Sequence, residues 1–126
     1  MTTPRFPRLF SPIRVGKALT LRNRIVVSPH TTVLADPGGY PSPREADYQA
    51  ARARGGVALT VLGTSVVHPS SSMEYGVLAN LDDSYVPAFR RVADAVHAHG
   101  AVVFAQLNHQ GLAAHGGGAG RPLQAP

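Results

Sequence analysis

The sequence contains no cysteine. Without thiols, the chain itself cannot form a disulfide, build a thiolate zinc site, ligate an iron–sulfur cluster through cysteine or use a cysteine nucleophile. Any redox chemistry must therefore come from a bound cofactor.

Lysine is nearly absent as well, because eleven of the twelve basic residues are arginine. The formal net charge of +5 would on its own suggest a polyanionic partner. The arginines are dispersed from Arg5 to Arg121, however, with no run longer than Arg90-Arg91 and no lysine-rich tail. This spacing is typical of a solvated surface that can also receive an anionic small ligand, and we expect no nucleic-acid partner.

Long apolar runs are missing too. The N-terminal segment has no apolar stretch of signal-peptide length, and no run is long enough to span a membrane. The chain has 126 residues, 44% hydrophobic and 15% charged, which is typical of one globular domain rather than a disordered chain. We therefore expect a cytoplasmic protein without a membrane partner.

The sequence does contain three continuous, valine-rich apolar runs. They predict strands over about 24–28, 57–63 and 101–107, and their lack of alternation is typical of strands buried on both faces of a parallel sheet. Alternating apolar residues around Gly16-Lys17 predict a hairpin over about 12–22, ahead of the first of these strands.

Clear start and stop signals predict two helices between the strands. Ser42 with Glu45 three residues later forms a capping-box pattern at the start of a helix over about 43–54. A second helix is predicted over about 83–99, closed by Gly100. The alternation of strands and helices fits an open doubly wound sheet or part of a (β/α)8 barrel, and composition does not choose between them.

Four segments resemble one family in collinear order: "LFSPIRVGKALTLRNRIVVSPH", "ARARGGVALTV", "TSVVHPSS" and "VPAFRRVADAVHAHGAVVFAQLNHQG". From Leu9 to Pro126 the chain resembles the N-terminal part of the old yellow enzyme family of FMN-dependent NADH:flavin oxidoreductases. The Ser-Pro-His sequence favours the branch that contains 2,4-dienoyl-CoA reductase and trimethylamine dehydrogenase.

The resemblance implies an α/β fold: the N-terminal portion of a TIM (β/α)8 barrel, with about three β/α units after an N-terminal hairpin and FMN at the C-terminal mouth of the strands. In a complete homologue, NADH or NADPH would give hydride to FMN, which passes it to an activated alkene or takes it from an amine. A complete barrel needs about 250 residues. We therefore expect the chain to be a fragment, inactive alone, without the catalytic residues of later strands.

An alternative is a non-catalytic assembly module. Half a barrel leaves sheet edges with unpaired backbone groups, so association is physically expected. The partner would be a C-terminal half barrel or a second copy of the chain.

Polar residues follow the first apolar strand where it reaches the expected barrel rim. By the resemblance, Ser28, Pro29, His30 and Thr31 contact the flavin, and the Thr31 hydroxyl lies near its C4 carbonyl. Such a donor stabilises negative charge on reduced flavin. The alternative is that this stretch is only a polar exit from a strand.

The second and third strands supply the other candidates. Gly63 and Thr64 stand where relatives place a small residue that lets backbone approach the flavin. Gln106 interrupts an apolar strand, and a buried amide must find partners. The resemblance assigns Gln106 to the flavin N3 and C2 carbonyl edge, whereas the alternative is a bond to a neighbouring loop.

Further along the same motif, His109 is expected to organise its loop, and Leu112 stands where relatives carry arginine. We expect no metal site. His97 and His99 point in different directions on a helix, and His109 and His115 have no carboxylate nearby in the sequence.

Overall fold

Strand β4 (Leu59–Val66) is the centre of a parallel sheet in the computed structural model of the chain, which describes residues 5–71, 76–111 and 114. One edge of β4 pairs with β6 (Val102–Asn108). The other edge pairs first with β3 (Val26–Val27) and then with the short strand β5 (Leu78–Ala79). The sequence did not predict β5.

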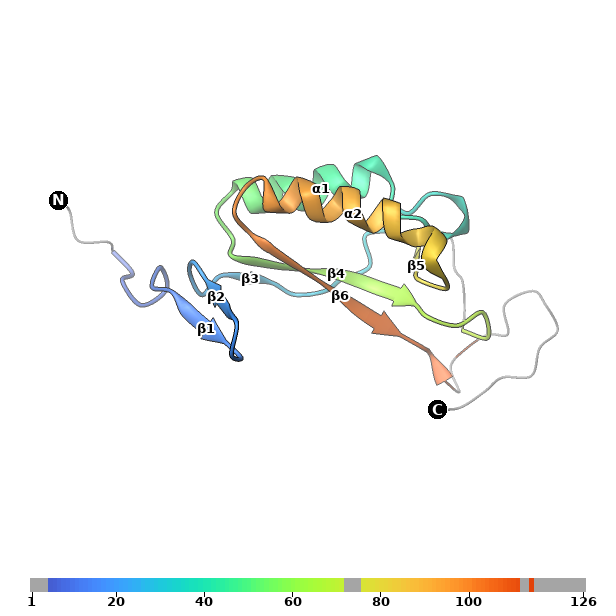
Figure 1. Cartoon of the computed structure of the whole chain (residues 1–126), viewed down its shortest axis with the longest axis horizontal. Helices are drawn as coiled ribbons and strands as arrows, with labels where there is room; N and C mark the ends of the chain where they lie inside the picture. Colours follow the sequence, from blue (N-terminus) through green and yellow to red (C-terminus); the bar gives the residue numbers. More distant parts are fainter. Residues whose placement is uncertain (1–4, 72–75, 112–113, 115–126) are drawn as a thin grey trace.

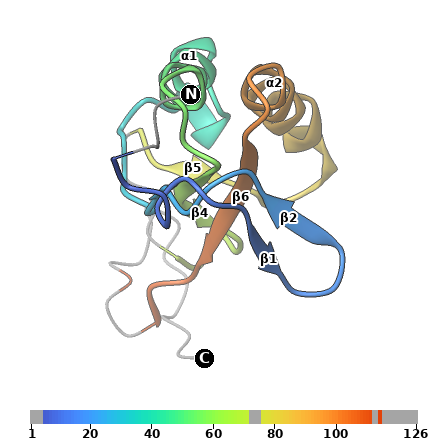
Figure 2. The same cartoon turned by 90° about the vertical axis from the view of Figure 1, so that its left-hand side faces the viewer.

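Two helices lie side by side on one face of this sheet (Figures 1 and 2). Helix α1 spans Pro43–Arg54, the range the sequence predicts, and Ser42 caps it by accepting a hydrogen bond from the Glu45 amide at 3.1 Å. Helix α2 spans Val86–His97 and follows the 3-10 turn η2 (Asp83–Tyr85). The second predicted helix is therefore too long at both ends.

The core fills the space between the helices and the sheet. Its centre joins Ala46 of α1, Leu62 of β4, Leu78 of β5 and Val92 of α2. A second cluster packs the C-terminal ends of both helices together through Ala53 and Val96, next to Ala101. Alanine side chains in α1 let the two helices pack closely over the sheet.

The predicted hairpin forms from β1 (Ile13–Val15) and β2 (Leu19–Leu21), which pair antiparallel. It lies at the N-terminal end of the parallel strands (Figure 1), where Leu21 packs on Ala58 and Leu59. Next to it, the Arg22 guanidinium donates hydrogen bonds to three carbonyl oxygens near the C-terminal ends of α1 and α2, those of Ala53, Val57 and His99. A cation at two helix C-termini is favourable because the exposed carbonyls there carry partial negative charge.

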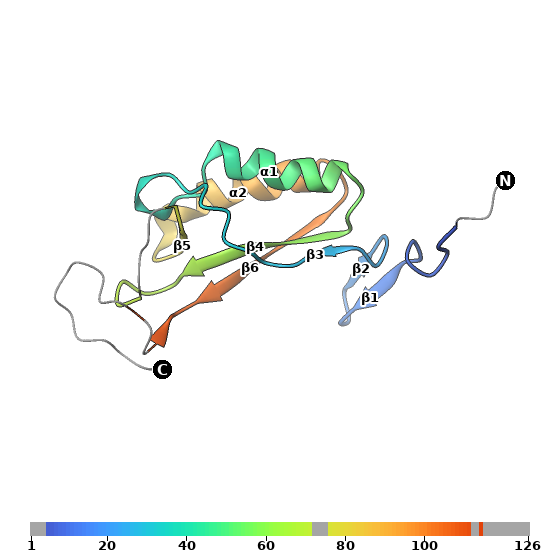
Figure 3. The same ribbon diagram turned by 180° about the vertical axis from the view of Figure 1, so that it is seen from behind.

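The face of the sheet opposite the helices has no covering layer among the described residues (Figure 3). On this face Phe104 of β6 is 44% exposed and Val26 of β3 is 47% exposed, whereas Leu107, which is 63% exposed, points to the helix side near the end of β6. The prediction that each strand is buried on both faces is therefore wrong for β3 and β6, although it holds for β4, in which most residues are buried. No helix within 5–71 or 76–111 is long and apolar enough to cross a membrane.

Candidate functional site

A β-bulge brings three of the predicted site residues together near the C-terminal ends of β4 and β6. Leu62 pairs with Ala105 and Ser65 pairs with Leu107, so Gly63 and Thr64 on one strand face the single residue Gln106 on the other. Bulges bend a strand and redirect its side chains, and they are common next to active sites. The sequence pattern gave no sign of this irregularity.

The segment after β3, residues 28–32, is called here the rim loop. Its backbone packs directly on Gly63, because a Cβ atom placed there would lie 2.0 Å from the carbonyl oxygen of His30. The Thr31 hydroxyl donates to the Thr64 hydroxyl at 3.4 Å. Gly63 therefore allows close packing between two segments of the chain, and approach of the backbone to a ligand there stays a prediction.

Three rim-loop residues, Ser28, Pro29 and His30, come before Thr31 in the chain. Ser28 and His30 are exposed and Pro29 is half-buried. The His30 Nε2 atom lies 2.5 Å from the Tyr48 hydroxyl of α1, with the two ring centroids 5.6 Å apart. One nitrogen of the imidazole is thus engaged by the chain itself.

Gln106 is exposed, so the expectation that it is a buried amide is wrong. It lies two residues after Phe104 and projects from the same face of β6, the face without helices. Burial therefore does not force its amide to bond within the chain. The carboxamide is presented to solvent beside Gly63 and Thr64 instead.

A buried polar network that the sequence did not predict lies behind the rim loop. The side chain of Glu45 was expected to complete the capping box, but it turns inward and is 0% exposed. It accepts a hydrogen bond from the Gln49 amide at 2.7 Å and one from the Thr32 hydroxyl, and Thr60 of β4 donates to Gln49 at 2.6 Å. The spacing of Glu45 and Gln49, one helical turn apart, was the available signal.

A second polar cluster joins the loops that follow β4 and β6. The Ser70 hydroxyl lies 2.6 Å from His68 Nδ1 and 2.9 Å from His109 Nε2, and the Gly111 amide donates to His109 Nδ1 at 2.9 Å. His109 thus organises its loop, as predicted. Leu112 and His115 lie outside the described residues.

These observations place hydroxyl and amide groups from three adjacent parallel strands at one end of the sheet. The sequence profile described as the NADH:flavin oxidoreductase / NADH oxidase family matches residues 8–121. The chain belongs to this family.

Members of the NADH:flavin oxidoreductase family are similar to the chain in sequence and in structure. An NADH oxidase of Thermoanaerobacter brockii is 45% identical over 84% of the chain and 16% of its own length. A 4,4'-dithiodibutanoate disulfide reductase of Rhodococcus erythropolis is 41% identical over 91% of the chain and 28% of its own length.

The structure of the old yellow enzyme homologue from Zymomonas mobilis matches with a TM-score of 0.74 and 32% identity, over 83% of the chain and 29% of that protein. The chain thus spans between 16% and 29% of the length of these relatives. Its fold is the N-terminal portion of an old yellow enzyme TIM barrel. The bulge and the rim loop stand at the C-terminal end of its strands, where active sites of TIM barrels lie.

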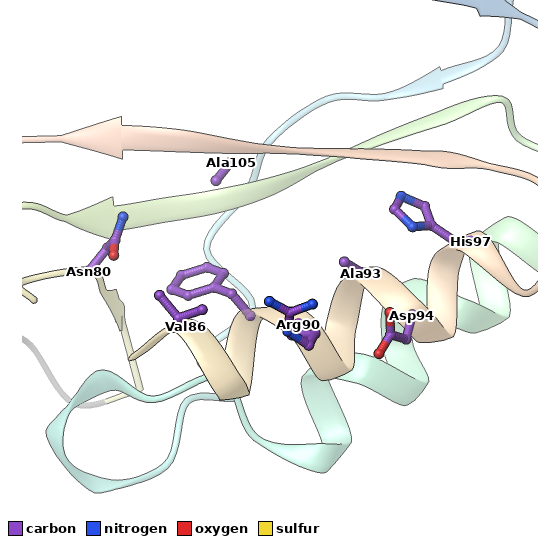
Figure 4. A pocket seen from close by; sticks show the side chains of 8 residues that line it. Asn80, Val86, Arg90, Ala93, Asp94, His97 and Ala105 are labelled. Carbon is purple, nitrogen blue, oxygen red and sulfur yellow. The ribbon is translucent and has the colours of Figure 1, made fainter. Parts of the chain in front are cut away.

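A groove of about 560 Å³ in this portion lies on the helix side of the sheet, between α2 and β6 (Figure 4). Its floor is apolar, with Val86, Phe89, Ala93 and Ala105, and Arg90 and His97 are the basic residues that line it. Within the described residues, no group of three or more His, Asp or Glu side chains could hold a metal ion.

Proposed function

We propose that the chain carries part of the FMN site of an oxidoreductase of the old yellow enzyme type. The observation that carries the proposal is the convergence of Thr31, Thr64 and Gln106 at the C-terminal rim of three adjacent strands. FMN, when bound, supplies hydride chemistry between a reduced nicotinamide, NADH or NADPH, and an activated alkene or an amine. The substrate is a small molecule, and its identity is set by parts of the barrel beyond this chain.

The donor set at the rim fits the polar edge of a flavin ring. That edge is uncharged and alternates carbonyl acceptors with an N–H donor. A carboxamide offers one donor side and one acceptor side. Because Gln106 is exposed, both sides are accessible to a ligand. The threonine hydroxyls add donors without adding charge.

The apolar surroundings also fit a flat aromatic ring. Phe104 is 44% exposed, precedes Gln106 on the same face of β6 and lies beside Val61 of β4. Ligand sites of this kind combine apolar walls with a few convergent polar groups. The rim residues would bind and orient the ring, and the Thr31 hydroxyl would give up its long 3.4 Å bond to Thr64 and donate to the C4 carbonyl of the flavin.

The experiment is an equilibrium titration of the purified chain with FMN, followed by flavin fluorescence. We expect saturable binding, and Gln106→Ala should raise the dissociation constant roughly tenfold because one hydrogen bond of about 1 to 2 kcal/mol is lost. Gln110→Ala, a change of the same type beyond the strand, is the matched control and should leave the constant unchanged. Equal affinity in the wild type and Gln106→Ala would remove Gln106 from the site.

A second candidate function is assembly with a C-terminal half barrel. Two observations favour it: β6 pairs with β4 alone among the described strands, and the groove beside α2 runs along that open side of β6. The next β/α unit of a barrel occupies this place. A C-terminal half barrel from a relative, mixed with the chain, should form a one-to-one complex by light scattering, and Ala105→Arg in the groove should prevent it.

A further inference from the structure

We propose that helix α1 positions the rim loop for flavin binding through Glu45 and Tyr48, which act as positioning residues. The inference rests on the proposed FMN site and concerns how that site is held. Glu45 accepts a hydrogen bond from Thr32, and Tyr48 is bonded to His30. The two ties hold the loop on either side of Thr31, the residue whose hydroxyl faces Thr64.

The tie to Thr32 is anchored in the interior. Glu45 is fully buried, and its other carboxyl oxygen is held by Gln49, which is itself held by Thr60 of the central strand. A buried carboxyl group must keep its hydrogen-bond donors, because leaving it without them is costly. The position of Thr32 is therefore fixed relative to both α1 and β4.

The tie to His30 is anchored on the helix surface. The Tyr48 hydroxyl reaches His30, and the Arg52 guanidinium lies over the Tyr48 ring while donating to the Tyr48 carbonyl at 2.8 Å. An arginine stacked on an aromatic face restricts the ring. Because the Tyr48 ring is itself restricted, its hydroxyl can hold the His30 imidazole in one position.

Gly63 of β4 contacts the rim loop between the two hydrogen-bonded residues, at His30 and Thr31. The carbonyl of His30 and the amide of Thr31 rest on the glycine, so the loop cannot move toward β4 without a clash. With ties at His30 and Thr32 and contact at Gly63, the backbone of Thr31 has a single arrangement. A ligand that bonds to Thr31 then meets a preorganised group, which lowers the entropic cost of binding.

The test combines backbone dynamics of the ligand-free chain with FMN affinity, using Thr32→Val, Tyr48→Phe and the double variant. In the wild type, we expect ¹⁵N order parameters of roughly 0.85 for residues 30–32, as in rigid backbone, and values below about 0.6 in the double variant. The FMN dissociation constant should rise about tenfold in the double variant because ordering of the loop is then required on binding. Each single change should have an intermediate effect on both readings.

Two controls separate positioning from general damage. Thr32→Ser keeps the hydroxyl and should restore wild-type order parameters and affinity. Tyr40→Phe removes a comparable hydroxyl contact, the one to Ser84 at 2.9 Å, which does not involve the rim loop, and should change neither. Order parameters near 0.85 in the double variant would overturn the inference even if FMN binds. Absence of FMN binding by the wild type would overturn the proposed function, while the order parameters would still decide whether α1 positions the loop.

Discussion

At the residue scale, Gly63 decides how closely the rim loop approaches the sheet. The carbonyl oxygen of His30 occupies the space where any other residue would carry a Cβ atom. Only glycine allows this contact without movement of the backbone. The position of Thr31, and with it the geometry of the rim loop, therefore depends on the absence of a side chain at residue 63.

Gly63→Ala should lower the free energy of unfolding by about 1 to 3 kcal/mol, because the new methyl group forces the loop and the strand apart. Urea unfolding followed by circular dichroism measures this loss. Gly55→Ala is the control: Gly55 has a helical φ of −68°, and a Cβ there would lie 3.2 Å from its nearest neighbour. A loss at residue 63 no larger than at residue 55 would contradict the packing account.

Thr31→Val should shift the midpoint potential of bound FMN more than its affinity. Loss of a hydroxyl donor to the C4 carbonyl destabilises the negative charge of reduced flavin. A hydrogen bond of about 1 kcal/mol corresponds to a potential lower by roughly 20 mV for a two-electron couple. Thr31→Ser keeps the donor and should keep the potential, whereas an unchanged potential in Thr31→Val would refute this role.

The sequence located the rim residues but not their surroundings. The motif around Gln106 predicted the right strand, yet the argument from burial failed because that strand is at the open side of the sheet. The role of Glu45 was also assigned wrongly. A capping pattern predicts only contacts within the helix that carries it. Thr32, the actual partner of the Glu45 side chain, is brought close by tertiary structure.

At the scale of elements, the turn before α2 is fixed to the loop after β3 by two tyrosines. The rings of Tyr40 and Tyr85 stack with centroids 4.2 Å apart, and the Tyr85 hydroxyl donates to the Gly38 carbonyl, in the 3-10 turn η1 (Pro37–Gly39), at 2.8 Å. Burial raises the pKa of Tyr85, and the neighbouring Tyr40 and Asp82 raise it further. This contact therefore requires the protonated phenol.

The stability that Tyr85 provides should depend on alkaline pH. A folded-state pKa above the unfolded value of about 10 means that the contribution is complete below pH 10 and is lost as the pH rises through the folded value. Tyr85→Phe should be less stable than wild type by about 1 kcal/mol at pH 8, and the gap should narrow at pH 11. Urea unfolding at both values measures the gap, and an equal difference at the two would contradict this account.

Elements with strong local signals could be predicted from sequence, and those that depend on distant partners could not. Helix α1 has its cap, its proline and its closing glycines within fifteen residues, so its bounds follow from the sequence. Strand β5 has two residues and exists because Ser65 and Val66 offer an edge for pairing. The bulge at Gly63 likewise depends on the register between β4 and β6.

At the scale of the whole molecule, the chain forms a sheet with helices on one face, which matches only part of the barrel of its relatives. Its helices cover one face of the sheet, and Val26 and Phe104 remain exposed on the other. Relatives of which the chain spans 16% to 29% have the length to cover this face with later strands.

The most direct test of the central claim, that the rim of β3, β4 and β6 forms a flavin site, is an NMR titration of the ¹⁵N-labelled chain with FMN. We predict chemical-shift changes concentrated at the amides of Thr31, Gly63, Thr64 and Gln106 and at the Gln106 side-chain amide, with saturation. Changes that centre instead on the groove beside α2, or no changes at the rim while FMN is in excess, would contradict the account.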